Sequence, residues 1–144
     1  MAVLASVSAA LVATAGPALA SDTSFSVTVK HSNGTIVSTM SGNVVWYNRS
    51  AALTNIKQYI RGGECSYAAI SSYSVLGVVD YRNTAKRCPS SNTTYSLNNI
   101  LLNGNNEDSD GDGQPGPLLE AITDIDIELL DVNDDRHAFQ VLRR

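Results

Sequence analysis

The sequence predicts an all-β protein, and two observations carry that prediction. First, short runs of alternating apolar and polar residues recur along the chain, with turn residues between them about every 8–12 residues. Second, the chain is rich in Ser, Thr and Asn and poor in Met, Phe and Glu, a composition that suits strands and polar turns better than helices. Together they predict a single antiparallel β-sandwich, immunoglobulin-like with Greek-key connections, of about eight strands and with one disulfide.

The first 20 residues have the pattern of a secretory signal peptide. A small-residue apolar run is interrupted by Gly16-Pro17 and ends in an A-x-A sequence at Ala20. The run contains no Lys or Arg, which leaves open a start upstream of Met1. A membrane anchor is the alternative, but a modestly apolar run broken by Gly-Pro does not favour a span. We therefore expect cleavage after Ala20, a secreted protein, and no membrane span in its mature form.

The mature chain, residues 21–144, is long enough for one domain with its own core. Residues 41–144 are expected to form that core, with residues 21–40 as an N-terminal hairpin at its periphery. In an exported chain the two cysteines, Cys65 and Cys88, predict one structural disulfide. Closing that loop stabilises the fold by roughly 3 to 3.5 kcal/mol on the chain-entropy model.

The N-terminal half predicts a hairpin followed by a further strand. Residues 25–30 alternate, residues 35–40 resume an extended pattern, and Asn33-Gly34 between them is a strong hairpin signal. Residues 42–48 form another strand, and they carry Trp46, the only tryptophan, between apolar neighbours. Trp46 is therefore interpreted as a core residue.

Residues 50–61 fit two structures. As a helix, the segment would begin at Ser50 and place Leu53, Ile56 and Ile60 on one stripe. As a strand, it would place Thr54, Ile56, Gln58 and Ile60 on one face. Local propensity favours the helix slightly. The strands expected on both sides favour the strand, which is the prediction we adopt.

The C-terminal half predicts strands at residues 64–71, 76–82, 95–102, 122–132 and 137–142, with a long polar loop at 103–117. Residues 122–132 show the clearest alternation. Ile125, Ile127 and Leu129 share one face, and the acidic residues between them share the other. This pattern predicts one face in the core and one in water.

Several short motifs resemble a loose group of small exported actinobacterial (Streptomyces-like) β-sandwich proteins of unknown function. The matching features are Gly42-x-Val44-x-Trp46-Tyr47-Asn48-Arg49, Gly63-Glu64-Cys65, Asp80-x-Arg82-x-Thr84 before Cys88, and the strand that begins at Tyr95. The resemblance covers about two thirds of the chain. It implies the sandwich, the disulfide and a strand at residues 50–61, and it implies no active site.

The polar loop contains a calcium-loop pattern. Asp108, Asp110, Asp112 and Gly113 match the first half of a D-x-D-x-D-G motif, in which alternate carboxylates converge on one hard cation. Position 12 of the motif is Leu119, where an EF-hand has a bidentate Glu. The loop is therefore either a calcium site outside the EF-hand class or a solvated acidic surface loop, and no cofactor is required.

Catalytic patterns are weak. The sequence has no G-x-S-x-G elbow, and its two histidines, His31 and His137, suggest neither a triad nor a metal cluster. A glycosidase needs two convergent carboxylates, and nothing singles out Glu64, Asp80 or Asp124. We therefore expect a protein without catalytic activity, with a small hydrolase as a minor alternative.

The function predicted from the sequence is an extracellular binding or surface-associated module. A net charge of −4 without clustered cations argues against nucleic acid and leaves polysaccharide or protein as partners. One alternative is a carbohydrate-binding module with a calcium-supported loop, and another is a secreted enzyme inhibitor that acts through residues 103–117. Several aromatic residues are candidates for a sugar-stacking platform: Trp46, Tyr47, Tyr59, Tyr67, Tyr73, Tyr81 and Tyr95.

Overall fold

The computed structural model describes residues 22–104 and 121–144. Within these ranges the chain forms nine β-strands and no helix, so it has none that is long and apolar enough to cross a membrane. The strands are β1 (Asp22–Lys30), β2 (Ile36–Trp46), β3 (Ala51–Ile60), β4 (Ser66–Ser74), β5 (Gly77–Asn83), β6 (Thr93–Ser96), β7 (Ile100–Leu102), β8 (Asp124–Asp131) and β9 (Arg136–Arg143). The predicted signal peptide and the predicted calcium ligands Asp108, Asp110 and Asp112 lie outside the described residues.

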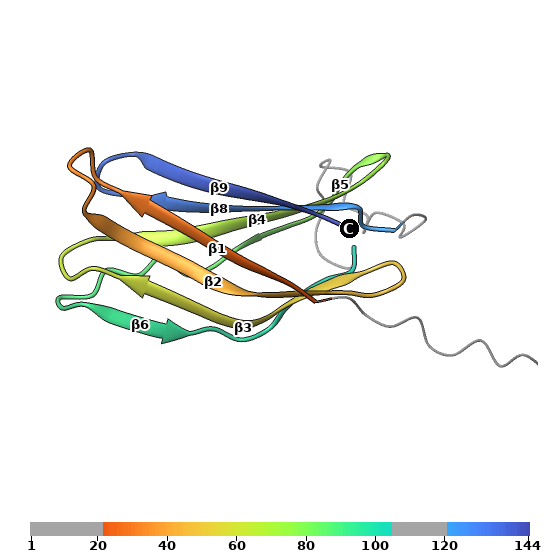
Figure 1. Cartoon of the computed structure of the whole chain (residues 1–144), viewed down its shortest axis with the longest axis horizontal. Helices are drawn as coiled ribbons and strands as arrows, with labels where there is room; N and C mark the ends of the chain where they lie inside the picture. Colours follow the sequence, from red (N-terminus) through yellow and green to blue (C-terminus); the bar gives the residue numbers. More distant parts are fainter. Residues whose placement is uncertain (1–21, 105–120) are drawn as a thin grey trace, which may run out of the picture.

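The strands form two antiparallel sheets that pack face to face, as Figure 1 shows. One sheet has the order β1-β2-β3-β6, with β7 also paired to β3, and the other has the order β5-β4-β8-β9. The chain changes sheet from β3 to β4, from β5 to β6 and from β7 to β8. This Greek-key connectivity confirms the predicted β-sandwich, and the order of the second sheet is that of an immunoglobulin C′-C-F-G sheet.

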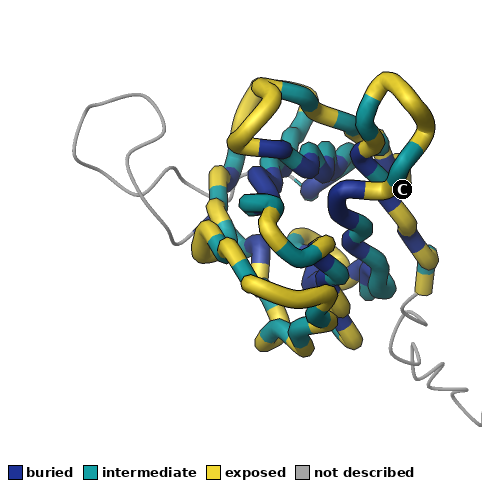
Figure 2. Tube along the Cα trace, turned by 90° about the vertical axis from the view of Figure 1, so that its left-hand side faces the viewer, coloured by how far each residue is buried: buried dark blue, intermediate teal, exposed yellow. Residues whose placement is uncertain are grey.

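The core lies between the two sheets, where Figure 2 shows buried residues enclosed by exposed turns. In β8 the residues Ile125, Ile127 and Leu129 are fully buried, as their alternation predicts. Trp46 is 2% exposed and donates its indole N–H to Thr23 Oγ1 at 3.2 Å, which confirms it as a core residue. The two layers therefore bury most of the apolar side chains between them.

Residues 50–61 form a strand, β3, which confirms the adopted prediction over the helix. The predicted face was wrong in part, because Leu53 is buried and Thr54 is not. The pairing of β2 with β3 shifts register between Ser41 and Asn43, and Asn55 opposite this point adopts a φ of 52°. The extra residue of this bulge moves the buried face from odd to even positions along β3.

Two strand boundaries also differ from the prediction. Residues 35–40 and 42–48 form one continuous strand, β2, in which Gly42 lies at the bulge and leaves no room for a Cβ, since Thr54 O would lie 2.8 Å from it. Residues 95–102 instead form two strands, β6 and β7, which pair with β3 on either side of the same bulge. The bulge between β2 and β3 accounts for both differences, because it lies within β2 and between the parts of β3 that pair with β6 and β7.

The Cys65–Cys88 disulfide forms as predicted. It joins the start of β4 to the segment between β5 and β6, at the end of the sandwich where the β1–β2, β3–β4 and β8–β9 turns meet (left in Figure 1). The Asn33-Gly34 turn is also confirmed: Gly34 has a φ of 86°, and Asn33 Oδ1 accepts the backbone N–H of Thr35. We call this end of the molecule the turn end.

Candidate functional site

The outer face of the β5-β4-β8-β9 sheet gathers polar and aromatic side chains. Because Ile125, Ile127 and Leu129 face the core, Asp126 and Glu128 of β8 point outward. The register places Ser71 of β4 opposite Asp126, and Phe139 of β9 opposite Glu128. Paired residues share a face, so groups from three strands meet outside the sandwich.

These side chains line a shallow groove with a volume of about 330 Å³. Phe139 is 70% exposed, which is unusual for a large apolar side chain. Tyr73 lies across the groove on β4, and its hydroxyl hydrogen-bonds the Asp126 carboxylate. We call this surface the sheet-face groove; its lining includes Ser71, Tyr73, Asp126, Glu128, His137 and Phe139.

Two carboxylates give the groove an acidic lining, and a histidine lies beside one of them. Burial, together with the charge of Asp124, raises the pKa of Asp126, while the Tyr73 hydrogen bond opposes that rise. His137 Nδ1 lies 2.8 Å from Glu128 Oε1; the side chain of His137 is largely exposed and that of Glu128 is partly exposed. The groove thus combines an exposed aromatic ring with oxygen acceptors, which can bind a ligand that has both C–H surfaces and hydroxyl donors.

A second constellation occupies the turn end. His31 follows β1, Glu64 precedes β4, and Asp134 lies in the turn between β8 and β9. His31 Nε2 lies 2.9 Å from Glu64 Oε1, and His31 Nδ1 lies 3.0 Å from Asp134 Oδ2. One imidazole therefore connects turns from both sheets.

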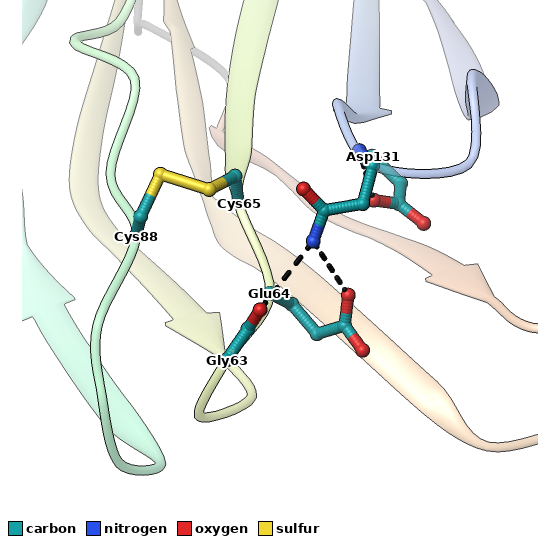
Figure 3. Close-up of a disulfide and its surroundings, with 6 residues drawn as sticks. Gly63, Glu64, Cys65, Cys88 and Asp131 are labelled. Atoms are coloured by element: carbon teal, nitrogen blue, oxygen red, sulfur yellow. Dashed lines mark hydrogen bonds between the residues drawn. A yellow bond between two sulfur atoms is a disulfide. The ribbon is translucent and has the colours of Figure 1, made fainter.

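Two further residues complete this constellation. Asn133 Nδ2 donates to Glu64 Oε2 at 3.0 Å and to the Gly63 carbonyl at 3.4 Å. Figure 3 shows Gly63 and Glu64 next to the disulfide, on the side where Asp131 lies. Asp131, the last residue of β8, is 1% exposed and accepts the Asn133 backbone N–H through Oδ1. Among the described residues, His31, Asp131 and Asp134 could hold a metal, since their ligand atoms lie within 4.8 Å of one another.

At the turn end, Glu64 and Asp134 raise the pKa of His31, and His31 in turn helps to lower the pKa of Glu64. The hydrogen bond to Glu64 is the main cause that raises the pKa of His31, with Asp134 adding to it and burial opposing it. The hydrogen bond from Asn133 is the main cause that lowers the pKa of Glu64, followed by the bond from His31. Both pKa shifts favour the charged forms, so the His31 imidazolium and the Glu64 carboxylate stabilise each other.

Sequence spacing pointed to no partner for either histidine, yet in the structure each lies against a carboxylate. His31 and Glu64 are 33 residues apart in sequence, and His31 and Asp134 are 103 apart. No local spacing signals such contacts. Phe139 was also missed, although it falls at the same alternate positions as the polar residues His137 and Arg143, which could have marked it as outward-facing.

Of the predicted aromatic candidates, Trp46 is in the core, and the tyrosines lie in different parts of the sandwich. Tyr67, Tyr73 and Tyr81 belong to the outer face that carries the groove. Tyr95 lies under the Arg87 guanidinium, 4.5 Å from its ring centroid. Tyr47 is exposed beyond the end of β2. Three of the predicted tyrosines thus share a face with Phe139.

The three carboxylates considered for glycoside hydrolysis do not converge. Glu64 lies at the turn end and Asp124 at the opposite end of β8, about seven strand residues or roughly 23 Å away. Asp80 is fully buried on the inner face, where its Oδ2 accepts the Gly104 N–H at 2.6 Å. A hydrolytic pair needs carboxyl groups about 5–9.5 Å apart.

No protein-family model, curated protein or solved structure matches the chain. The resemblance to exported actinobacterial proteins therefore stays a prediction from short motifs. A proposal about function depends on the fold and on the geometry of its side chains.

Proposed function

We propose that the protein is an extracellular, non-catalytic binding module that holds a neutral saccharide in the sheet-face groove. The observation that carries the proposal is Phe139, 70% exposed in a groove that also presents the Asp126 and Glu128 carboxylates. The disulfide is compatible with an extracellular location, and the predicted signal peptide supports it.

The chemistry of the groove matches the two faces of a sugar. An aromatic ring binds the apolar C–H face of a pyranose, and neighbouring oxygen atoms accept its hydroxyl protons. Phe139 supplies the ring, while Glu128 and Asp126 supply acceptors on the adjacent strand. These carboxylates would repel an acidic polysaccharide, so a neutral glycan is the ligand class that the groove favours.

The alternatives depend on residues outside the described ranges. A calcium-supported binding module requires Asp108, Asp110 and Asp112 to form a site, and an enzyme inhibitor would act through residues 103–117. The experiment therefore includes arms for both. Glycan binding that fades with EDTA would add calcium to the proposal, and inhibition of a protease or glycosidase without glycan binding would replace it.

Binding of the purified protein to insoluble and soluble neutral polysaccharides tests the proposal. Phe139→Ala should weaken binding by about 2- to 12-fold, because aromatic contacts of this kind contribute about 0.5–1.5 kcal/mol. Tyr47→Ala is the matched control, since Tyr47 is an exposed aromatic residue that does not line the groove. Equal binding by wild type and Phe139→Ala, or no binding to any glycan tested, would contradict the proposal.

A further inference from the structure

The turn end contains a buried carboxylate oxygen that no described group satisfies. Asp131 is 1% exposed, and its Oδ1 accepts the Asn133 N–H at 3.0 Å. Its Oδ2 is buried and has no hydrogen-bond partner among the described residues. Leaving a buried carboxylate oxygen unpaired is costly, so this atom calls for a partner, a donor or a cation, that the described residues do not supply.

The neighbours of Asp131 are metal-ligating groups. The ligand atoms of His31, Asp131 and Asp134 lie within 4.8 Å of one another. Ligands of a tetrahedral zinc ion are about 3.4 Å apart when the bonds are about 2.1 Å long. The His31 Nδ1 to Asp134 Oδ2 distance is 3.0 Å, so small side-chain movements would bring the set to that geometry.

Glu64 prepares His31 for such a role. Its Oε1 lies 2.9 Å from His31 Nε2, where it can accept the Nε2 proton and leave the Nδ1 lone pair for an ion on the Asp134 side. Asn133 in turn holds Glu64 through its side-chain amide at 3.0 Å. A carboxylate that accepts the second ring proton of a ligating histidine is a recurrent feature of zinc sites.

We propose that the turn end binds one zinc-class divalent transition ion through His31 Nδ1, Asp131 and Asp134, with Glu64 as a positioning residue. A set of one nitrogen and carboxylate oxygens suits zinc, whereas calcium and magnesium prefer oxygen ligands alone. Asp134 is 43% exposed and His31 21%, so the ion has a route from solvent and water can complete its coordination. The proposed ligands are not among the residues that line the sheet-face groove or among the predicted calcium ligands.

The site joins the two sheets. His31 follows β1 in one sheet, and Asp131 ends β8 in the other. An ion bound to both is present only in the folded state, so it stabilises the sandwich by mass action. Zinc should therefore raise the melting temperature in proportion to the logarithm of its concentration once the site is filled.

Calorimetric titration of the EDTA-treated full chain with zinc tests the proposal. We expect one ion per chain, with Asp134→Asn and Asp131→Asn each weakening the affinity by more than about 100-fold, since losing a group that only orients a ligand costs about 10–100-fold. The matched control is His137→Gln, which removes the histidine paired with Glu128 on the sheet face and should bind zinc as wild type does. Asp110→Asn controls for binding in the acidic loop and should also leave the affinity unchanged.

Circular dichroism without zinc shows whether each variant is folded. If Asp131→Asn does not fold, the zinc affinity of Asp134→Asn tests the proposal alone. The side chain of Asp134 is 43% exposed, so its replacement should leave the fold intact. Absence of zinc binding, binding retained by Asp134→Asn, or binding abolished by His137→Gln or Asp110→Asn would overturn the proposal. If the chain binds calcium at this site, and Asp134→Asn abolishes that binding, the assignment to a zinc-class ion would be wrong.

Discussion

The two histidines form a natural comparison between the turn end and the sheet-face groove. Both contact a carboxylate, His31 at 2.9 Å from Glu64 and His137 at 2.8 Å from Glu128. The side chain of His137 is 65% exposed and has one such partner, whereas that of His31 is 21% exposed and has carboxylates at both nitrogens. The pair at the sheet face resembles an ordinary surface ion pair, which contributes little to stability.

The difference lies in what surrounds each pair. Around His31 three turns converge, and the buried Asp131 lies within ligand distance. Around His137 the neighbours are an open groove and the exposed ring of Phe139. A histidine beside a carboxylate therefore indicates a metal site only where other donors, held by the fold, face the same point. The same pair in a groove with an aromatic ring is better suited to binding a ligand at the surface.

Removal of the disulfide should have the largest effect: it should lower the stability of the whole domain and, of the two proposed binding sites, weaken only the one at the turn end. Cys65→Ser combined with Cys88→Ser opens a loop with a sequence separation of 23 residues. The loss is about 3 kcal/mol on the loop-entropy model, and it frees the backbone next to Glu64. Chemical denaturation should show this loss, and zinc affinity should fall, while glycan binding by the folded fraction persists. Unchanged zinc affinity in the double variant would show that the turn end is held without the disulfide.

Truncation of the carboxylate beside each histidine, Glu64 or Glu128, should have a smaller effect, and each change should weaken binding at one site only. Glu64→Ala should weaken zinc binding about 10–100-fold, because Nε2 loses the acceptor that orients the ring. Glu128→Ala, the equivalent change at the sheet face, should leave zinc binding unchanged and weaken glycan binding. Glu64→Gln should recover part of the affinity, since its amide oxygen still accepts the Nε2 proton. Equal zinc affinities for the Glu64→Ala and Glu128→Ala variants, measured by titration, would remove the distinction between the regions.

The smallest effect concerns the pH dependence of stability at the groove. The pKa of Asp126 is raised, mainly by burial, so the folded state binds its proton more tightly than the unfolded state does. Ionisation of Asp126 therefore destabilises the fold as the pH rises from about 4 through the raised pKa. Asp126→Asn should remove this loss, so the stability of the variant relative to wild type should increase over that interval and then level off. Denaturant midpoints measured from pH 3 to pH 7, at intervals of about half a unit, check the trend, and a constant difference across that range would contradict it.

The sequence allowed the prediction of features that depend on local pattern. Alternation in residues 122–132 identified β8 and its buried face, and Asn33-Gly34 identified a hairpin. The cysteine content, together with the predicted export, predicted the disulfide. These features are encoded within a few neighbouring residues, where side-chain period and turn chemistry act directly.

Features that depend on cross-strand geometry could not be predicted. The bulge near Asn55 shifts the buried face of β3 and separates β6 from β7, yet Asn55 itself has nothing in its immediate sequence that marks a bulge. The turn-end constellation combines residues from three turns, so only the assembled sandwich brings them together. The same is true of the sheet-face groove, since Tyr73, Asp126 and Phe139 come from three different strands.

The proposed ligand of this module lies against the outer face of β4, β8 and β9. Mapping of amide chemical shifts during titration with a neutral glycan tests that placement most directly. We expect the shifts to concentrate at Ser71, Glu128 and Phe139, and the amides near His31 and Asp134 not to move. Shifts centred on the turn end or on residues 103–117, with the sheet face unchanged, would contradict it.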